Sequence, residues 1–244
     1  PYSSAAVSKP TFIDIEDASW MWGILITDKD RVSTTGICNF PSHMGSLNYG
    51  YASVGGWRRI SPKLYNQIPE SDVRKGWFLD DTGVSVNLPA AAQAYITKKG
   101  APVYTQVKYG PMNDEWGSNN NATDVILMRV EEMYLIKAEA QAMNNDVSGG
   151  VNTLNSFVNT YRDPSYKCTA TTGEAVQEAV WHQRRIEFWG EGLAYFDIMR
   201  LNKGVNRLGC GFPKTAVFNI VAGDPVQIYS IPNKEVQYNP LLEN

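Results

Sequence analysis

The chain has 244 residues, a formal net charge of −3 and a hydrophobic share of 43%. This composition allows a sizeable apolar core and excludes a chain that is disordered throughout. The acidic balance argues against a nucleic-acid partner, and no apolar run approaches the roughly 18 residues that a membrane-spanning helix needs. With 2 histidines and no CxxC pair, we expect neither a metal site nor a cofactor.

The first 62 residues contain two features. The apolar run ASWMWGILIT, residues 18–27, predicts either a short helix or a buried strand, because periodicity does not separate the two over so few residues. Its Trp20 and Trp22 are expected in the core. Residues 31–62 are rich in Gly, Ser, Asn and Tyr, which predicts a long irregular loop of the kind that usually carries function.

The middle of the chain is predicted to be mostly loop. The stretch SPKLYNQIPESDVRKGWF indicates a short helix that ends near Pro69 and a second turn that starts at Ser71 or Asp72. Residues 80–121 read as loop, with one possible short strand at VYTQVKYG and a tip, WGSNNNAT, next to it.

From residue 123 onward the pattern becomes helical. A helix capped by Thr123 or Asp124 has apolar residues on two faces, which predicts packing on both sides, and it ends where Asn144–Asn145 and Gly149–Gly150 turn the chain. An antiparallel partner follows from Val151 to Tyr161. A third helix starts at the capping box of Thr171 and runs to Gly190, and AYFDIMRL makes a fourth. We expect two regions, 1–122 and 123–244, that form one domain.

The three cysteines, Cys38, Cys168 and Cys210, are far apart in the sequence. Three buried thiols are the favoured interpretation, and one disulfide with a single free thiol is the alternative.

Four stretches carry a resemblance to a known family. They are RVEEMYLIKAEAQAMN with the VNTLNSFVNTYR helix, then HQRRIEFWGEGLAYFDIMRLNKG, then IYSIPNKEVQYNP, and more loosely SPKLYNQIPESDVRKGW. In their order and spacing they resemble the SusD/RagB family, the surface glycan-binding lipoproteins of Bacteroidetes. The resemblance implies a mainly α fold: a TPR-like helical scaffold with long irregular, aromatic-rich loops and a few short strands.

The resemblance also implies a function without catalysis. A SusD-like protein binds extracellular oligosaccharide and delivers it to a SusC-like TonB-dependent transporter at the outer membrane. Family members are typically about twice as long, so this chain resembles their later part. A signal peptide and a lipidated cysteine would then lie upstream of Pro1. The implied location is the extracellular face of the outer membrane, with a lipid anchor as the only membrane attachment.

The residues that we expect to bind a glycan lie mainly in the loop NYGYASVGGWRR. Flat aromatic rings accept the C–H face of a sugar, and amides or guanidinium groups hydrogen-bond its hydroxyls. The candidates are Asn48, Tyr49, Tyr51, Trp57, Arg58 and, in the second loop, Trp116. The alternative is that these aromatic side chains hold the loops onto the scaffold.

Glu131, Glu132 and Glu139 raise the possibility of a glycoside hydrolase, which needs two carboxylates about 5–10 Å apart across a sugar. A helix with two buried faces leaves no cleft for the substrate. Ion pairing of these and the nearby acids with bases such as Arg184, Arg185 and Arg200 is therefore favoured. A structural subunit of a surface complex is a third hypothesis.

Overall fold

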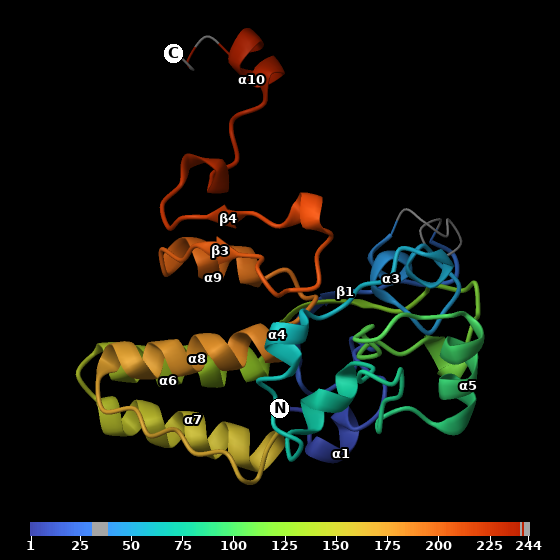
Figure 1. Ribbon diagram of the computed structural model, residues 1–244, viewed down its shortest axis with the longest axis horizontal. Helices are drawn as coiled ribbons and strands as arrows, with labels where there is room; N and C mark the ends of the chain where they lie inside the picture. The colour runs from blue at the N-terminus through green and yellow to red at the C-terminus, as the bar shows by residue number, and fades with distance from the viewer. Residues whose placement is uncertain (31–38, 240, 242–244) are drawn as a thin grey trace. The chain divides into compact units, whose positions relative to one another are not determined.

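The computed structural model describes residues 1–30, 39–239 and 241 (Figure 1). The chain divides into two compact units, Pro1–Leu193 and Ala194–Asn244, and each is described here by itself. In the first unit, one core cluster joins Phe12 and Trp77 with Ile126 and Ile186, so it includes side chains from both sides of position 122. The expected division of the chain at 122 and 123 stays a prediction.

Three helices lie side by side in the first unit: α6 (Val130–Met143), α7 (Val147–Tyr161) and α8 (Gly173–Glu187) (Figure 1). Helices α6 and α7 form a hairpin, and α8 packs against α6. Their shared core contains Leu135, Leu154 and other buried apolar side chains. The predicted antiparallel pair followed by a third helix is confirmed, and the prediction of a mainly helical chain is confirmed with it.

Two of these helices start several residues away from the predicted position, and α8 is capped by Thr172 rather than by the predicted Thr171. Residues 125–129 are a strand, so α6 starts at Val130 rather than near 123. Helix α7 starts at Val147, which places Gly150 inside the helix rather than in the turn. A Cβ atom on Gly150 would lie 2.7 Å from the carbonyl oxygen of Ala138 in α6. This glycine is therefore needed for the close approach of two helices, and the prediction that it turns the chain is wrong.

Helix α6 is packed on one face only within the described residues. Leu135, Ala138 and Ala142 are buried against α7 and α8. Ile136 and Met143, on the second apolar face, are exposed. The prediction of two packed faces is wrong for this second face, because periodicity identifies an apolar face but does not supply its partner.

The ambiguous run near the N-terminus is a strand. Strand β1 (Trp20–Ile24) pairs antiparallel with β2 (Val125–Arg129), and the two form a two-stranded ribbon. Trp20 is half-buried against the first core cluster, whereas Trp22 is 64% exposed. The core placement expected for Trp22 is wrong, because an isolated ribbon leaves part of its surface uncovered.

Short helices occupy much of the rest of the first unit. They are α1 (Ser4–Val7), α3 (Phe40–Met44), α4 (Pro62–Tyr65) and α5 (Ala90–Lys98), with 3₁₀ helices at Ala52–Val54, Val73–Trp77 and Met112–Asp114. The predicted short helix is confirmed as α4, although it ends at Tyr65 rather than near Pro69, and the predicted second turn is confirmed as Val73–Trp77, capped by Asp72. Helix α5 was not predicted. The possible strand at 103–110 is reduced to isolated bridges of Thr105 with Arg59, of Gln106 with Phe78 and of Tyr109 with Thr11.

The second unit begins with α9 (Ala194–Arg200), as predicted. It continues through a pair of two-residue strands, β3 (Val205–Asn206) and β4 (Asn219–Ile220), to α10 (Asn233–Tyr238), with 3₁₀ helices at Lys214–Ala216 and Pro225–Gln227. Across the described part of the chain, none of the helices has the length and apolar character to cross a bilayer.

The cysteines are only partly as predicted. Cys168 is a buried free thiol, but Cys210 is a half-exposed free thiol, so the expectation of three buried thiols is wrong for Cys210. Cys38 lies outside the described residues.

Candidate functional site

The loop that follows α3 carries five of the six candidate residues. Its backbone is held against α3: the N–H of Tyr51 donates to Oγ of Ser42 at 3.2 Å, and the N–H of Gly56 donates to the carbonyl of Tyr51 at 3.0 Å. A Cβ atom on Gly56 would lie 2.5 Å from two atoms of the Tyr51 ring. Glycine at this position therefore allows the ring of Tyr51 to lie flat against the backbone.

The second aromatic loop, predicted separately, lies beside the first. The N–H of Tyr49 donates to the carbonyl of Ser118 at 2.7 Å, and the N–H of Gly117 donates to that of Leu47 at 2.8 Å. Asn48 is buried, and its side-chain amide donates to Oδ1 of Asn121. Asn48 thus joins the two loops beneath the surface, and the surface candidates are the five residues around it.

Tyr51 and Arg58 belong to one polar and aromatic group. The His43 and Tyr51 rings are 5.0 Å apart, and Cζ of Arg58 lies 5.7 Å from the Tyr51 ring centroid. The Arg58 guanidinium donates to the carbonyl of Gly56 at 2.8 Å and lies 3.2 Å from Nδ1 of His43. Its remaining N–H groups have no partner among the described residues, so they are available to hydroxyl or carboxylate oxygens of a ligand.

Tyr49 and Tyr51 are the candidates whose rings face solvent most. Tyr49 is 48% exposed and Tyr51 is 43% exposed. The ammonium of Lys99 lies 5.7 Å from the ring centroid of Tyr49 and 5.7 Å from that of Tyr95. Aromatic side chains with about half of their surface exposed, next to cationic hydrogen-bond donors, form a surface to which a polar ring with C–H faces can bind.

Trp57 and Trp116 are half-buried and pack against a small apolar cluster beneath the loops. We refer to this cluster as the loop core; its buried residues are Leu47, Leu79, Ala92, Ile96 and Val107. For the two tryptophans the structure thus shows the anchoring contact that the alternative interpretation expected. Glycan contact at either tryptophan stays a prediction.

The acids that raised the possibility of a hydrolase are not in a cleft. Glu131 is fully buried and pairs with Arg129 at 3.3 Å and with Arg162 at 3.2 Å. Glu132 pairs with Arg184 at 3.0 Å. The prediction of ion pairing for these two glutamates is confirmed. The pairing of Asp197 with Arg200, in the second unit, is also confirmed at 2.8 Å.

The most important partners of these acids were missed from the sequence. Eight buried side chains form one ion cluster: Asp72, Arg74, Lys108, Arg129, Glu131, Arg162, Glu187 and Glu191. Four are acidic and four are basic, so the formal charge of the ion cluster is zero. They come from segments up to 119 positions apart in the sequence (72 to 191). The pairs Asp72–Arg74 and Arg129–Glu131 are two positions apart, but no local pattern could have joined the cluster as a whole.

Glu187 lies at the centre of the ion cluster. Its side chain accepts hydrogen bonds from Arg74 at 3.1 Å, from Arg129 at 2.6 Å, and from Arg162 at two positions, both 2.8 Å. Burial alone would raise the pKa of Glu187, but the guanidinium groups of Arg162 and Arg129 hold that pKa well below its ordinary value. A carboxylate held in this way stays ionised and has no access to a substrate.

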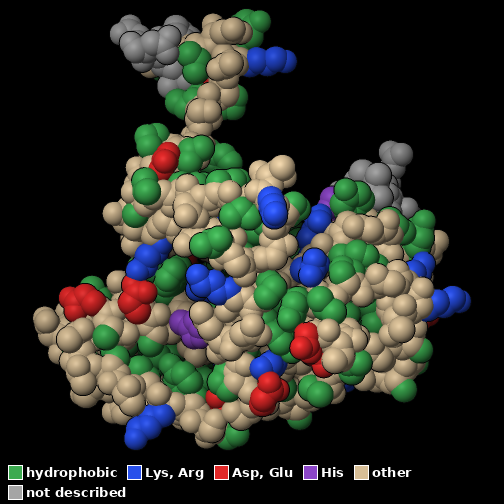
Figure 2. Space-filling model, viewed as in Figure 1, with side chains coloured by type: hydrophobic (Ala, Val, Ile, Leu, Met, Phe, Trp, Pro, Cys, Tyr) green, Lys and Arg blue, Asp and Glu red, His purple; other side chains and the backbone are tan. Residues whose placement is uncertain are grey.

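Among the described residues, no group of three or more His, Cys, Asp or Glu is arranged to hold a metal ion. On the face drawn in Figure 2, Lys and Arg side chains are interspersed with acidic, apolar and other side chains and form no continuous basic surface.

Comparison with known proteins identifies the family. The profile of the SusD family matches residues 60–243. This chain belongs to the SusD family. A search of curated proteins finds no match.

Solved structures share the fold of this chain. A SusD-like carbohydrate-binding protein from Bacteroides vulgatus has 21% identity and a TM-score of 0.71, and the match covers 97% of this chain and 50% of that one. A SusD superfamily protein from Bacteroides thetaiotaomicron has 22% identity and a TM-score of 0.73, with 98% of this chain and 51% of that one covered. The SusD-like fold expected from the resemblance is confirmed. The chain spans about half the length of these two relatives.

Proposed function

We propose that this SusD-family chain binds an extracellular oligosaccharide without catalysis, at the loop surface formed by Tyr49, Tyr51 and Arg58. The observation that carries the proposal is the exposure of the two tyrosine side chains beside the guanidinium group of Arg58. Some N–H groups of this guanidinium have no partner among the described residues. A sugar ring would stack on the rings through its C–H face, and its hydroxyls would accept hydrogen bonds from Arg58. Trp57 and Trp116 would bound the same surface, and Asn48 would keep the two loops together.

The environment of the carboxylates supports binding without hydrolysis. Glycoside hydrolysis requires two carboxyl groups on either side of a sugar, one of them able to give up a proton near neutral pH. Glu131 and Glu187 are buried and ion-paired, and the guanidinium groups around them keep both in the ionised form. Neither has the access or the protonation state that the acid in such a pair needs.

Delivery of the bound glycan to a SusC-like TonB-dependent transporter is part of the same proposal. Family membership supports it, and so do the exposed apolar side chains of the second unit, among them Phe212, Val226 and Tyr229. A partner protein that covered these side chains would remove apolar surface from water, which favours association. The corresponding location is the extracellular face of the outer membrane, where the full-length protein would be held by a lipid anchor.

The test is a calorimetric titration of the protein with a panel of neutral oligosaccharides, followed by analysis of the recovered sugars. We expect at least one glycan to bind, and Tyr49→Ala and Tyr51→Ala each to raise its Kd about tenfold, the effect of a central aromatic contact. Tyr238→Ala is the control, because this tyrosine is also exposed to solvent, at 82%, but lies in α10.

Two outcomes would contradict the proposal. If Tyr238→Ala weakened binding as much as the loop variants, the loops would not be the site. If the glycans were cleaved and Glu132→Gln abolished the cleavage, the chain would be a hydrolase. Glu132 is the appropriate position because its side chain is 13% exposed, whereas those of Glu131 and Glu187 are 0% exposed.

A further inference from the structure

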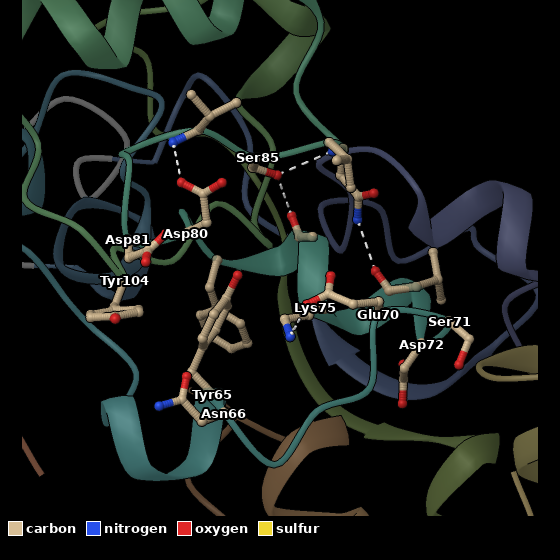
Figure 3. A pocket seen from close by; sticks show the side chains of 16 residues that line it. Tyr65, Asn66, Glu70, Ser71, Asp72, Lys75, Asp80, Asp81, Ser85 and Tyr104 are labelled. Atoms are coloured by element: carbon tan, nitrogen blue, oxygen red, sulfur yellow. Dashed lines mark hydrogen bonds and ion pairs between the residues drawn. The ribbon is translucent and has the colours of Figure 1, made fainter. Parts of the chain in front are cut away.

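A cavity of about 500 Å³ opens beside α4 and the 3₁₀ helix Val73–Trp77 (Figure 3). None of the six loop candidates lines it. Small-molecule sites in proteins usually have volumes of about 300–1,000 Å³, so the cavity is large enough for a ligand of the size of one or two sugar residues.

Tyr65 carries an unpartnered hydroxyl into this cavity. The residue is only 8% exposed, and its hydroxyl forms no hydrogen bond with any described residue. Figure 3 shows Tyr65 in the middle of the view, with Asp80 and Asp81 on one side and Glu70 and Lys75 on the other. The hydroxyl itself is not enclosed, because it is not one of the buried side-chain atoms that lack a hydrogen-bond partner in the described part of the chain. It therefore faces the solvent in the cavity, where a ligand can exchange hydrogen bonds with it.

Tyr104 forms an aromatic wall together with Tyr65. The two ring centroids are 5.1 Å apart and the ring planes meet at 57°. The backbone of Tyr104 has φ 65°, in the left-handed region that a bulky residue rarely adopts. Such strain is frequently found at functional sites. Here it accompanies a ring that lines a cavity.

Two of the four carboxylates that line the cavity are already neutralised. Asp72 pairs with Arg74 at 2.6 Å, and Glu70 pairs with Lys75 at 2.5 Å. The ammonium of Lys75 also lies 5.1 Å from the Tyr65 ring centroid. Lys75 thus neutralises Glu70 and also lies within cation–π distance of the Tyr65 ring.

The other two carboxylates, Asp80 and Asp81, have no cationic partner among the described residues. Burial tends to raise the pKa of Asp80, but hydrogen bonds from Thr82 and from the backbone N–H groups of Val84 and Gly83 outweigh it and lower that pKa. Asp81 is exposed and forms no hydrogen bond through its side chain with the described residues. One side of the cavity therefore carries two uncompensated negative charges beside two aromatic rings.

We propose that this cavity binds a sugar residue that carries a protonated primary amine. The C–H face of the sugar lies against Tyr65 and Tyr104, its ammonium faces Asp80 and Asp81, and one of its hydroxyls completes the hydrogen bonding of Tyr65. The choice of a sugar rests on the proposed function. The requirement for a cation and the position of the site follow from the cavity itself.

The test compares two probes that differ in charge. Calorimetric titrations at about pH 6, where an amine is protonated, use a β-1,4-linked glucosamine tetramer and its fully N-acetylated counterpart. We expect the glucosamine tetramer to bind at least about tenfold more tightly, and this preference to shrink as the salt concentration rises. Equal affinity for the two tetramers would overturn the proposal.

Variants locate the site. Asp81→Asn removes one charge from a side chain without hydrogen bonds to the described residues, so we expect an unchanged melting temperature. The ratio of the two affinities, glucosamine tetramer to N-acetylated tetramer, should fall about fivefold, or about 1 kcal/mol. Asp114→Asn makes the same change on an exposed side chain outside the cavity and should leave the preference intact. Tyr65→Phe keeps the ring, removes the unpartnered hydroxyl and should weaken binding several-fold. A similar loss in the Asp81 and Asp114 variants would indicate general electrostatics and reject the cavity.

The two proposals fail in different ways. If Tyr49→Ala and Tyr51→Ala abolish the preference for glucosamine and Asp81→Asn does not, the amine binds at the loops and the cavity proposal is wrong, while the proposed function stands. If no neutral glycan binds but the preference for glucosamine persists and depends on Asp81, the loop site is wrong and the cavity stands.

Discussion

Replacement of Glu187 by glutamine tests how the fold is held together. The substitution keeps the shape of the side chain but removes the negative charge that three guanidinium groups share. It also replaces one carboxylate oxygen with an NH₂ group that points at donors. The ion cluster, which has four acids and four bases, would then carry one uncompensated positive charge in a fully buried site.

The size of the effect follows from that burial. Loss of one partner from a buried ion pair costs about 3–5 kcal/mol, a large part of the roughly 5–15 kcal/mol that stabilises a typical domain. For a chain of this length the expected fall in melting temperature is about 6–20 °C. The free energy of unfolding is measured by urea denaturation and the melting temperature by calorimetry.

The matched control is Glu70→Gln. Glu70 forms a single ion pair with Lys75, but its side chain is 89% exposed, and exposed pairs contribute about 0–1 kcal/mol. If Glu187→Gln lowered the free energy of unfolding by no more than Glu70→Gln does, the central role of the ion cluster would be refuted.

Three further predictions concern pH and the aromatic loops. The pKa of Glu187 is lower in the folded chain than its ordinary value of 4.5, so the stabilisation from this carboxylate is present above about pH 4.5 and is lost as the pH falls toward the folded pKa. The melting temperature should therefore fall steeply between neutral and acid pH for the native chain and less steeply for Glu187→Gln. Parallel curves for the two proteins would contradict this. In Gly56→Ala the new Cβ must displace the ring of Tyr51, so glycan affinity measured by calorimetry should fall about as much as in Tyr51→Ala. The control for backbone strain is Gly55→Ala, whose Cβ meets no atom but whose φ is 125°. An equal loss of affinity in Gly55→Ala would show that displacement of the Tyr51 ring is not the cause. Trp57→Ala should lower the free energy of unfolding by about 2 kcal/mol, because the substitution removes the contact between the half-buried tryptophan ring and the loop core. An unchanged midpoint of urea denaturation would show that this contact does not stabilise the fold.

The sequence predicted those parts of the fold that depend on neighbouring residues. The apolar spacing along α7, the cap at the start of α8, the cap at Asp72 and the short helix at 62–65 are local features. Each lies within a few residues of the place that the pattern indicated. The family motifs are also read directly along the chain. Residues 125–129 are the instructive exception, because their helix-like spacing was overridden by pairing with Trp20–Ile24, more than 100 positions earlier.

Long-range contacts decided the candidate sites. The sequence marked Tyr49, Tyr51 and Trp116 as aromatic residues in loops, but it could not show that the two loops share backbone hydrogen bonds or that Trp116 packs on the loop core. It marked Glu131 for ion pairing without its partner Arg162, because a charged residue carries no sequence signal for the distant residue that neutralises it. Residue type and spacing thus determined the helices, the family and the aromatic character of the loops. Tertiary packing alone decided which side chains are buried, which charges are compensated and where a cavity remains, since these depend on segments brought together only when the chain folds.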